Sequence, residues 1–208
     1  MANTSIRGRA MGRVEAEYRR CCETPSDINE FLPLLKEYSA SCSHVTEFGV
    51  REVVSTWALL AGRPKRVVSY DLYRSPNIWR ALLLARLSGI AFSFIKGDTL
   101  NVTTELTDLL FIDTLRTYRQ LTGELALHAA HAKRFVILHD TTAFEYRDQS
   151  RSSSPEGLWP AVEKFLETHD EWRLRERLTN SAGLTVLERR RSSRLAVEVP
   201  ARVVNGDV

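Results

Sequence analysis

Five apolar stretches of the sequence each end on an acidic side chain, one of them preceded by a histidine. In chain order, the residues at these ends are Glu47, Asp71, Asp98, Asp113 and the pair His139-Asp140. A single carboxylate often caps a helix or forms a turn. Several at one edge repel one another, however, and need cations or hydrogen-bond donors. In an open α/β sheet the strands deliver their carboxyl ends to the edge where ligands bind, so the pattern predicts a functional cleft there.

The first three of these ends outline a pocket for adenosine. Gly49 follows the first stretch and permits close approach of a ligand to the backbone. Asp71 lies 22 residues later, where an acidic side chain accepts hydrogen bonds from a ribose diol. Asp98 is placed to receive an adenine amino group, and we expect the neighbouring Leu72 and Thr99 to contact the same ligand.

The loop after the first stretch indicates which adenosyl ligand to expect. Its sequence, GVREVVS, holds one glycine, whereas the dinucleotide fingerprint G-x-G-x-x-G needs three, so a pyrophosphate has no evident cradle. An adenosyl ligand without phosphates fits better, and we expect S-adenosylmethionine. Glu47 would then meet the methionine ammonium or a loop amide, and Arg51 or Ser55 would meet the methionine carboxylate.

The elements that must position these residues alternate between strand and helix patterns. Strand-like runs occupy residues 44–49, 66–72, 90–98, 109–113 and 133–140. Apolar residues recur at helical spacing over residues 26–40, 51–62, 77–87, 117–132 and 157–172. This alternation and the near-continuous apolar strands predict a parallel α/β sheet with right-handed crossovers. A closing pair of strands, 172–179 and 183–190, adds an antiparallel member.

Three local features of the helical segments carry further expectations. Ser26 or Asp27 is expected to cap the helix at 26–40, and Pro33 is expected to kink it. We expect His128 and His131 on the surface of their helix rather than among the ligands of a site.

Composition places the chain among globular proteins of one domain. It has 208 residues, of which 43% are apolar and 26% charged. No apolar run approaches the roughly 18 to 20 residues that cross a bilayer, and the basic N-terminus has no apolar core, so neither a membrane span nor a secretory signal is expected. The net charge of +3 is too small to indicate nucleic acid. Cys21, Cys22 and Cys42 form neither a disulfide framework nor a zinc motif, which favours the cytoplasm.

Six segments together resemble a class I S-adenosylmethionine-dependent methyltransferase. They read EFGVREVVS, VVSYDL, IKGDT, LLFIDTLRTYRQLTGELALHA, VILHDT and GLWPAVEKFL, and they span roughly residues 40 to 190. The nearest branch we identify is the cephalosporin-hydroxylase-like and small-molecule O-methyltransferase branch. The resemblance implies an α/β, Rossmann-like methyltransferase fold, with helices on both faces of a seven-stranded, mostly parallel sheet of order 3-2-1-4-5-7-6. It also implies O-methylation of a small-molecule acceptor such as a natural product, a sugar or a phenol.

The resemblance further implies a site for Mg²⁺ or another divalent metal. Asp113, His139 and Asp140 match the positions of the metal ligands in related enzymes. Arg116 occupies the position of a catalytic lysine or histidine, but a guanidinium keeps its proton and is a poor base. It would instead stabilise an alkoxide or hold an acidic group of the acceptor. His139 would ligate the metal or act as the base. Alternatively, Asp113 and His139 contact cofactor and substrate with no ion present.

The remaining expectations concern organisation and alternatives. The chain divides into an N-terminal helical segment, 1–40, a methyltransferase domain, 41–190, and a C-terminal tail, 191–208. The long polar loop 141–157 is expected to act as a substrate lid. No nucleic-acid or membrane partner is expected, and the N-terminal helices offer contacts for a homodimer. Two other functions stay open: a non-catalytic protein that binds S-adenosylmethionine, and an NAD(P)-dependent oxidoreductase.

Overall fold

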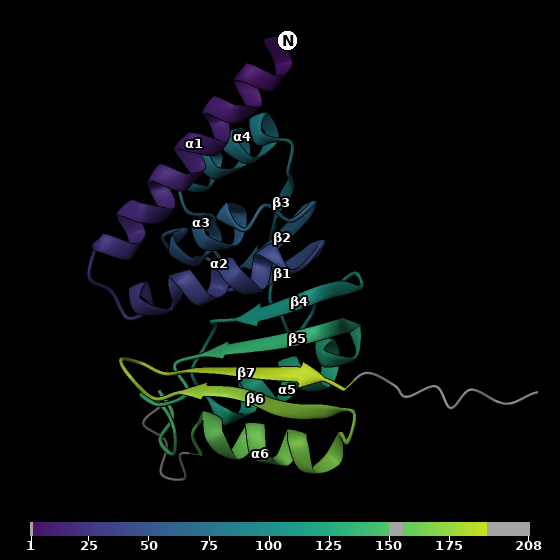
Figure 1. The fold of residues 1–208 in the computed structure, drawn as a ribbon. Coiled ribbons are helices and arrows are strands. Elements are labelled where there is room, and N and C mark those ends of the chain that lie inside the picture. Colours follow the sequence, from purple (N-terminus) through teal and green to yellow (C-terminus); the bar gives the residue numbers. More distant parts are fainter. Residues whose placement is uncertain (1, 150–155, 191–208) are drawn as a thin grey trace, which may run out of the picture.

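A single seven-stranded sheet forms the centre of the molecule (Figure 1). The computed structural model describes residues 2–149 and 156–190. Its strands lie in the order β3-β2-β1-β4-β5-β7-β6, with only β7 antiparallel to its neighbours, which confirms the predicted topology. The strands are β1 (His44–Phe48), β2 (Arg66–Asp71), β3 (Ala91–Lys96), β4 (Thr107–Ile112), β5 (Ala132–His139), β6 (Trp172–Leu178) and β7 (Leu184–Arg189).

Helices cover both faces of this sheet, as predicted (Figure 1). One face carries α1 (Ala2–Glu23), the 3-10 turn η1 (Asn29–Phe31), α2 (Leu32–Ala40), α3 (Val54–Ala61) and α4 (Ile78–Ser88). The other carries α5 (Tyr118–His128), the 3-10 turn η2 (Ala129–His131) and α6 (Leu158–Thr168).

Alternation along the central strands explains why one apolar run serves two cores. Leu109 and Phe111 of β4 lie in the cluster under α1–α4, whereas Leu110 and Ile112 lie in the cluster under α5 and α6. Successive side chains of a strand point to opposite faces of the sheet, so a strand covered on both faces must be apolar at every position. The strands that carry the site are thereby held rigidly from both sides.

The helix predicted over residues 26–40 is shorter in the structure. The α-helix α2 begins at Leu32 rather than near Ser26, and Pro33 lies in its first turn instead of kinking it. Proline is tolerated at that position because the first amide groups of a helix have no partner within the helix. Ser26 and Asn29 bond each other's backbone amides in the preceding turn, and Asp27 is left to contact the site described below.

Three further expectations concern membrane spans, the cysteines and the segments at 141–157 and 191–208. Within the described residues, no helix is both long and apolar enough to span a bilayer. The three cysteines are unpaired. Residues 150–155 of the predicted lid and the predicted tail at 191–208 lie outside the described residues.

Candidate active site

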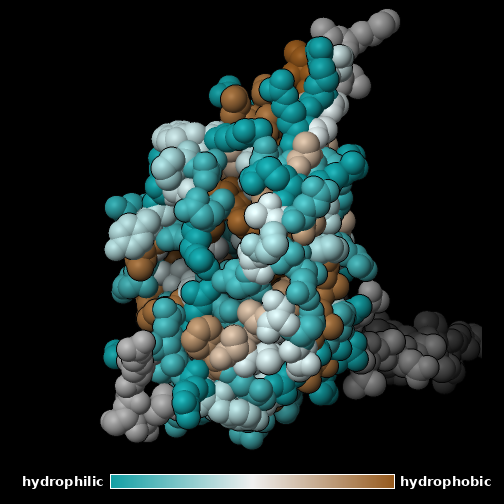
Figure 2. All heavy atoms as spheres, turned by 90° about the vertical axis from the view of Figure 1, so that its left-hand side faces the viewer, coloured by the Kyte–Doolittle hydropathy of each residue, from teal (hydrophilic) through white to brown (hydrophobic). Residues whose placement is uncertain are grey.

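A cavity of about 370 Å³ opens at the carboxyl ends of the parallel strands. Figure 2 looks onto this edge of the sheet, whose surface is hollowed near the middle. The cavity is lined by most of the residues predicted to bind the cofactor, namely Gly49, Arg51, Asp71, Leu72, Asp98, Thr99 and Asp113, and by Arg116. Sequence reasoning missed other lining residues, among them Tyr70, Gly97, Gln120 and Gln149.

The loop between β1 and α3 is shaped by an unusual backbone. Gly49 has φ +84°, and a Cβ atom on it would lie 2.0 Å from the carbonyl oxygen of Asp113. Arg51 (φ 43°) and Val53 (φ 69°) also adopt positive φ, which is rare for a non-glycine residue and strained for a β-branched one. Arg51 follows Gly49 at the spacing of a G-x-G pair, so the loop adopts at arginine and valine the backbone that glycines usually supply.

Asp71 holds this loop in place. Its Oδ2 accepts hydrogen bonds from the backbone amides of Val50 (2.7 Å) and Arg51 (3.0 Å), and its Oδ1 accepts one from Tyr73 (3.0 Å). A carboxylate offers about four acceptor positions, so one remains on Oδ1 for a hydroxyl in the cavity. Asp71 therefore both builds the loop and retains the capacity to bind a ribose.

Glu47 does not lie where it was predicted. Its side chain is completely buried and accepts hydrogen bonds from Ser55 (2.6 Å), Thr56 (2.8 Å) and Ser69 (2.5 Å). Direct contact with a methionine ammonium is excluded in this arrangement, because strand β1 turns the carboxylate into the layer between sheet and α3. Burial raises the pKa of Glu47 to about 7, against the opposing effect of the three hydroxyl donors. Ser55 borders a smaller, neighbouring cavity, but its hydroxyl is donated to Glu47.

The end of the cavity that was predicted to hold adenine rests on a buried polar network that the sequence analysis did not find. Asp98 accepts a bond from the backbone amide of Leu100 (3.0 Å) and so shapes the loop after β3. The Thr99 hydroxyl donates to the buried Glu124 (2.6 Å), and Gln120 donates to both of them (3.0 Å each). Burial raises the pKa of Glu124.

His128 belongs to the same network, which corrects its predicted place on the helix surface. It is almost completely buried, and its Nε2 lies 2.7 Å from the carbonyl oxygen of Thr99. His131, which was also predicted on the helix surface, is half-buried. Gln120, Glu124 and His128 recur every four residues along α5, a spacing that brings them to one face of the helix. That polar stripe was the available sequence signal.

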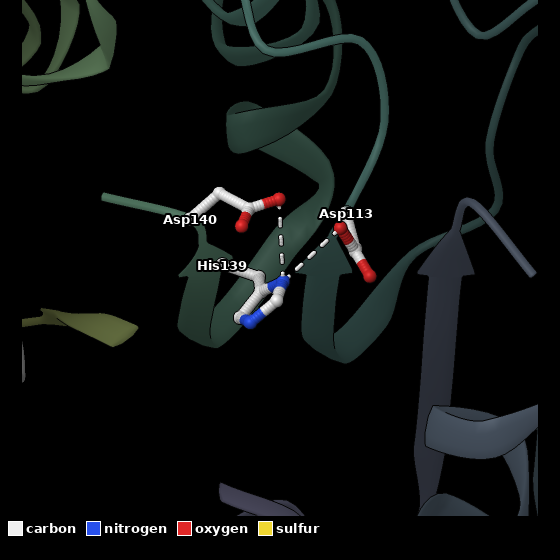
Figure 3. A group of neighbouring side chains, drawn as sticks. All are labelled: Asp113, His139 and Asp140. Carbon is white, nitrogen blue, oxygen red and sulfur yellow. Dashed lines mark hydrogen bonds and ion pairs between the residues drawn. The ribbon is translucent and has the colours of Figure 1, made fainter. Parts of the chain in front are cut away.

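Asp113, His139 and Asp140 form the second half of the site, and Figure 3 shows them converging from the ends of β4 and β5. The His139 Nδ1 atom lies 3.2 Å from Asp113 Oδ1 and 3.5 Å from Asp140 Oδ2. Its Nε2 atom lies 3.1 Å from the carbonyl oxygen of Asp27. Both ring nitrogens thus face only acceptors, an arrangement that requires a proton on each. Although burial opposes the charged form, the two carboxylates raise the pKa of His139 to about 10.

Arg116 supplies a second cation to this group. Its Nε donates a short hydrogen bond to Asp140, and its Nη2 lies 3.5 Å from Asp113 Oδ1 and 3.8 Å from Asp27 Oδ2. The guanidinium carbon also lies 5.9 Å from the centre of the Phe144 ring. Burial acts to raise the pKa of Asp140, but His139 and Arg116 together hold it below its ordinary value.

The predicted metal ligands are brought together, yet the atoms that face one another, Asp113 Oδ1, His139 Nδ1 and Asp140 Oδ2, are already engaged. One ligand atom from each of Asp113, His139 and Asp140 lies within 4.8 Å of the others. A metal ligand must be deprotonated, whereas His139 Nδ1 carries a proton and Asp140 accepts from Arg116. In this arrangement the residues do not fit a divalent ion. With both ring nitrogens facing acceptors, His139 offers no free lone pair for a general base in this arrangement.

Asp27 is a site residue that sequence reasoning assigned to a helix cap. Its carboxylate lies 3.2 Å from Arg51 and 3.8 Å from Arg116, and its carbonyl accepts from His139. It therefore joins the N-terminal segment to the loops after β1, β4 and β5. No sequence signal distinguishes this aspartate from an ordinary cap, because its partners lie 24 to 112 positions away.

The described part of the loop 141–157 lies beside the site. Phe144 packs against the core and under Arg116, and the backbone amide of Gln149 donates to the carbonyl oxygen of Arg116 (2.9 Å). Tyr146 is exposed. Trp159 is buried in the core and donates to Glu163 (2.7 Å).

Comparisons with known proteins agree with this architecture. No family model and no curated protein matches the sequence. Among solved structures, a protein from Corynebacterium glutamicum superposes with a TM-score of 0.65 at 16% identity, over 89% of this chain and 92% of that one. A candidate caffeoyl-CoA O-methyltransferase from Staphylococcus aureus gives 0.59 at 15% identity, over 85% and 91%.

A third structure, the N-methyltransferase NodS from Bradyrhizobium japonicum with S-adenosyl-L-homocysteine, gives a TM-score of 0.57 at 21% identity, over 86% of this chain and 98% of that one. At such identities the likeness concerns the fold. It confirms the predicted Rossmann-like methyltransferase fold and leaves the chemistry to the residues of the site.

Proposed function

We propose that the protein is an S-adenosylmethionine-dependent methyltransferase that transfers a methyl group to a hydroxyl of a small molecule. The observation that carries the proposal is the cavity of about 370 Å³ that Gly49, Asp71, Asp98 and Asp113 line. Its volume falls within the usual range of small-molecule sites, about 300 to 1,000 Å³. In this fold, ligands bind at that edge of the sheet.

The residues present fit an adenosyl cofactor. The free acceptor position of Asp71 suits a ribose hydroxyl, and the loop at Asp98 and Thr99 suits adenine. Arg51 also lines the cavity and offers a cation for the methionine carboxylate. Its side chain is 60% exposed, and among the described residues it pairs only with Asp27, at 3.2 Å. When bound, S-adenosylmethionine supplies an electrophilic methyl on a sulfonium sulfur. The protein must align an oxygen with that carbon–sulfur axis, and such alignment is worth effective molarities on the order of 10⁵ M.

We place the acceptor in the smaller cavity beside Asp113. This cavity has a volume of about 160 Å³, is bordered by Ser26, Asp27 and Ser55, and shares Arg51 and Asp113 with the large one. The shared aspartate would therefore lie between donor and acceptor.

Asp113 is the group best suited to take the acceptor proton. As the carbon–oxygen bond forms and the carbon–sulfur bond breaks, the hydroxyl proton passes to a carboxylate oxygen and from there to solvent. Asp113 uses Oδ1 for His139 and Arg116, and among the described residues no partner is recorded for its Oδ2. Arg116, which lines the large cavity and lies 3.5 Å from Asp113 Oδ1, would hold this carboxylate in position.

A titration calorimeter provides the first test. S-adenosylhomocysteine should bind with a stoichiometry of one, whereas NADH should show no saturable heat. NADH binding with no heat from S-adenosylhomocysteine would overturn the proposal and favour the oxidoreductase.

A second experiment separates catalysis from binding alone. Transfer of a labelled methyl group should be measured against a panel of phenols, sugars and hydroxy acids. A non-catalytic binding protein is the second candidate, because Arg116 keeps its proton and both ring nitrogens of His139 face acceptors. Binding of S-adenosylhomocysteine without transfer to any of these acceptors would support that alternative.

A further inference from the structure

One guanidinium meets three carboxylates that come from distant parts of the chain. Arg116 donates to Asp140 after β5, and lies within 3.5 Å of Asp113 after β4 and 3.8 Å of Asp27 before η1. Its side chain is only 17% exposed, so little water screens these charges. Arginine suits this position because its planar fork carries five N–H donors and its charge is permanent.

The guanidinium and a divalent ion would compete for the same lone pairs. A metal held by Asp140 and His139 would have to lie close to both, at about 2.0 to 2.2 Å from each ligand atom. The Arg116 Nε–H donates to Asp140 Oδ2, and His139 Nδ1 faces Asp113 Oδ1. An ion could enter only if the guanidinium withdrew, and a withdrawn guanidinium would still repel it from nearby.

We propose that the Arg116 guanidinium is the resident cation of this site, and that it excludes divalent metals by occupying the space between Asp113 and Asp140. It neutralises the gathered carboxylates and lines the large cavity beside Asp113, where it would hold the proposed base in position during methyl transfer. That role in methyl transfer rests on the proposed function. The exclusion of metals does not, and it can be tested without any acceptor.

The test compares Mn²⁺ binding by the full-length protein and two variants that differ in charge. Arg116→Lys keeps a cation in the site, whereas Arg116→Gln has no charge and keeps hydrogen-bonding capacity. Mn²⁺ would be titrated calorimetrically, with free Mn²⁺ followed by electron paramagnetic resonance. We expect no saturable site in the parent protein or Arg116→Lys. Arg116→Gln should gain one site at least about tenfold tighter, because a full charge a few ångströms from the ion has been removed.

Two further variants locate the site and exclude a general effect. Arg116→Gln combined with Asp140→Asn should lose the new Mn²⁺ site. Arg66→Gln, which releases Glu105 from an ion pair elsewhere (2.7 Å), should bind no more Mn²⁺ than the parent. Thermal melting confirms that each variant is folded.

Two outcomes would overturn the inference. Either the parent binds Mn²⁺ as tightly as Arg116→Gln at a site that Asp140→Asn abolishes, or no folded Arg116 variant binds the ion at all. Neither result touches the binding of S-adenosylhomocysteine, so failure here remains distinct from failure of the proposed function.

Discussion

Replacing Glu47 by glutamine should change how the stability of the protein depends on pH. This carboxylate has no exposed surface and three hydroxyl partners, Ser55, Thr56 and Ser69. Burial raises its pKa from 4.5 to about 7. The folded protein therefore keeps a proton on Glu47 in a pH range where the unfolded chain has released it. Glutamine is nearly the same size, can still bond to the hydroxyls, and does not titrate.

The magnitude follows from the shift. Stability from this group is complete below pH 4.5 and is lost as the pH rises through about 7, because above that value the folded state must bury a charge. Raising the pKa of Glu47 from 4.5 to about 7 corresponds to roughly 3 kcal/mol, because each tenfold change in the dissociation constant is worth about 1.36 kcal/mol. That is a large share of the roughly 5 to 15 kcal/mol that stabilises a typical domain.

Urea unfolding at intervals from pH 5 to pH 8 measures the effect. The free energy of unfolding of Glu47→Gln minus that of the parent should rise by about 2.5 kcal/mol across this range, because part of the change already occurs below pH 5. The subtraction removes the contribution of all other titrating groups. Asp108→Asn is the matched control with the opposite sign. Although burial opposes it, the backbone amides of His44 and Ser43 lower the pKa of Asp108, so its contribution is lost only as the pH falls below about 4. Its difference curve should be flat from pH 5 to 8.

A flat difference curve for Glu47→Gln over the same range would refute the reasoning. It would mean that the three hydroxyls compensate the buried charge fully, or that water reaches it.

Three further substitutions test the site. Gly49→Ala should lower the free energy of unfolding by about 2 kcal/mol or more and weaken S-adenosylhomocysteine binding, since the new Cβ would lie 2.0 Å from the Asp113 carbonyl; unchanged urea unfolding would contradict the close contact. Asp71→Ala should weaken the binding of S-adenosylhomocysteine at least about 100-fold by calorimetry, because it removes the proposed ribose acceptor and leaves the amides of Val50 and Arg51 unpaired. Unchanged affinity would contradict the adenosine pocket as described. Asp113→Asn should slow methyl transfer about 100- to 10,000-fold and change S-adenosylhomocysteine affinity little, while excess EDTA should leave the parent rate unchanged; the reverse pattern would place Asp113 in binding, or a metal in the reaction.

The sheet and most of the cavity could be predicted from the sequence because their signals are local. Apolar runs of strand length, each ending on a carboxylate, predicted the strands and the edge at which Asp71, Asp98 and Asp113 meet, while the strand order came from the resemblance to the family. A strand delivers its last residue to that edge whatever its side chain later contacts.

The errors concern side-chain direction and long-range pairing. Glu47 lies one residue before the end of β1, so its carboxylate enters the layer between the sheet and α3 instead of the cleft. His128 was assigned to the surface, although its spacing from Glu124 places both on the buried face of α5. Asp27 joins the site through a turn whose partners are far away in sequence. Such contacts depend on how α1 and α2 pack, which periodicity alone does not reveal.

The contact between Gly49 and Asp113 has a consequence for how precisely the reaction can be aligned. The Asp113 amide donates to the carbonyl of Phe48 (2.8 Å), and the Asp113 carbonyl fills the space where a Gly49 side chain would stand. The loop that would hold the cofactor and the backbone of Asp113, whose side chain would take the proton, are therefore spaced by main chain against main chain. No rotamer change can alter this backbone spacing. A displacement of about 1 Å can slow a reaction about 100-fold, so this backbone contact would keep the distance between the methyl donor and Asp113 constant. Substitutions in the surrounding loops could then change the range of substrates without changing that distance.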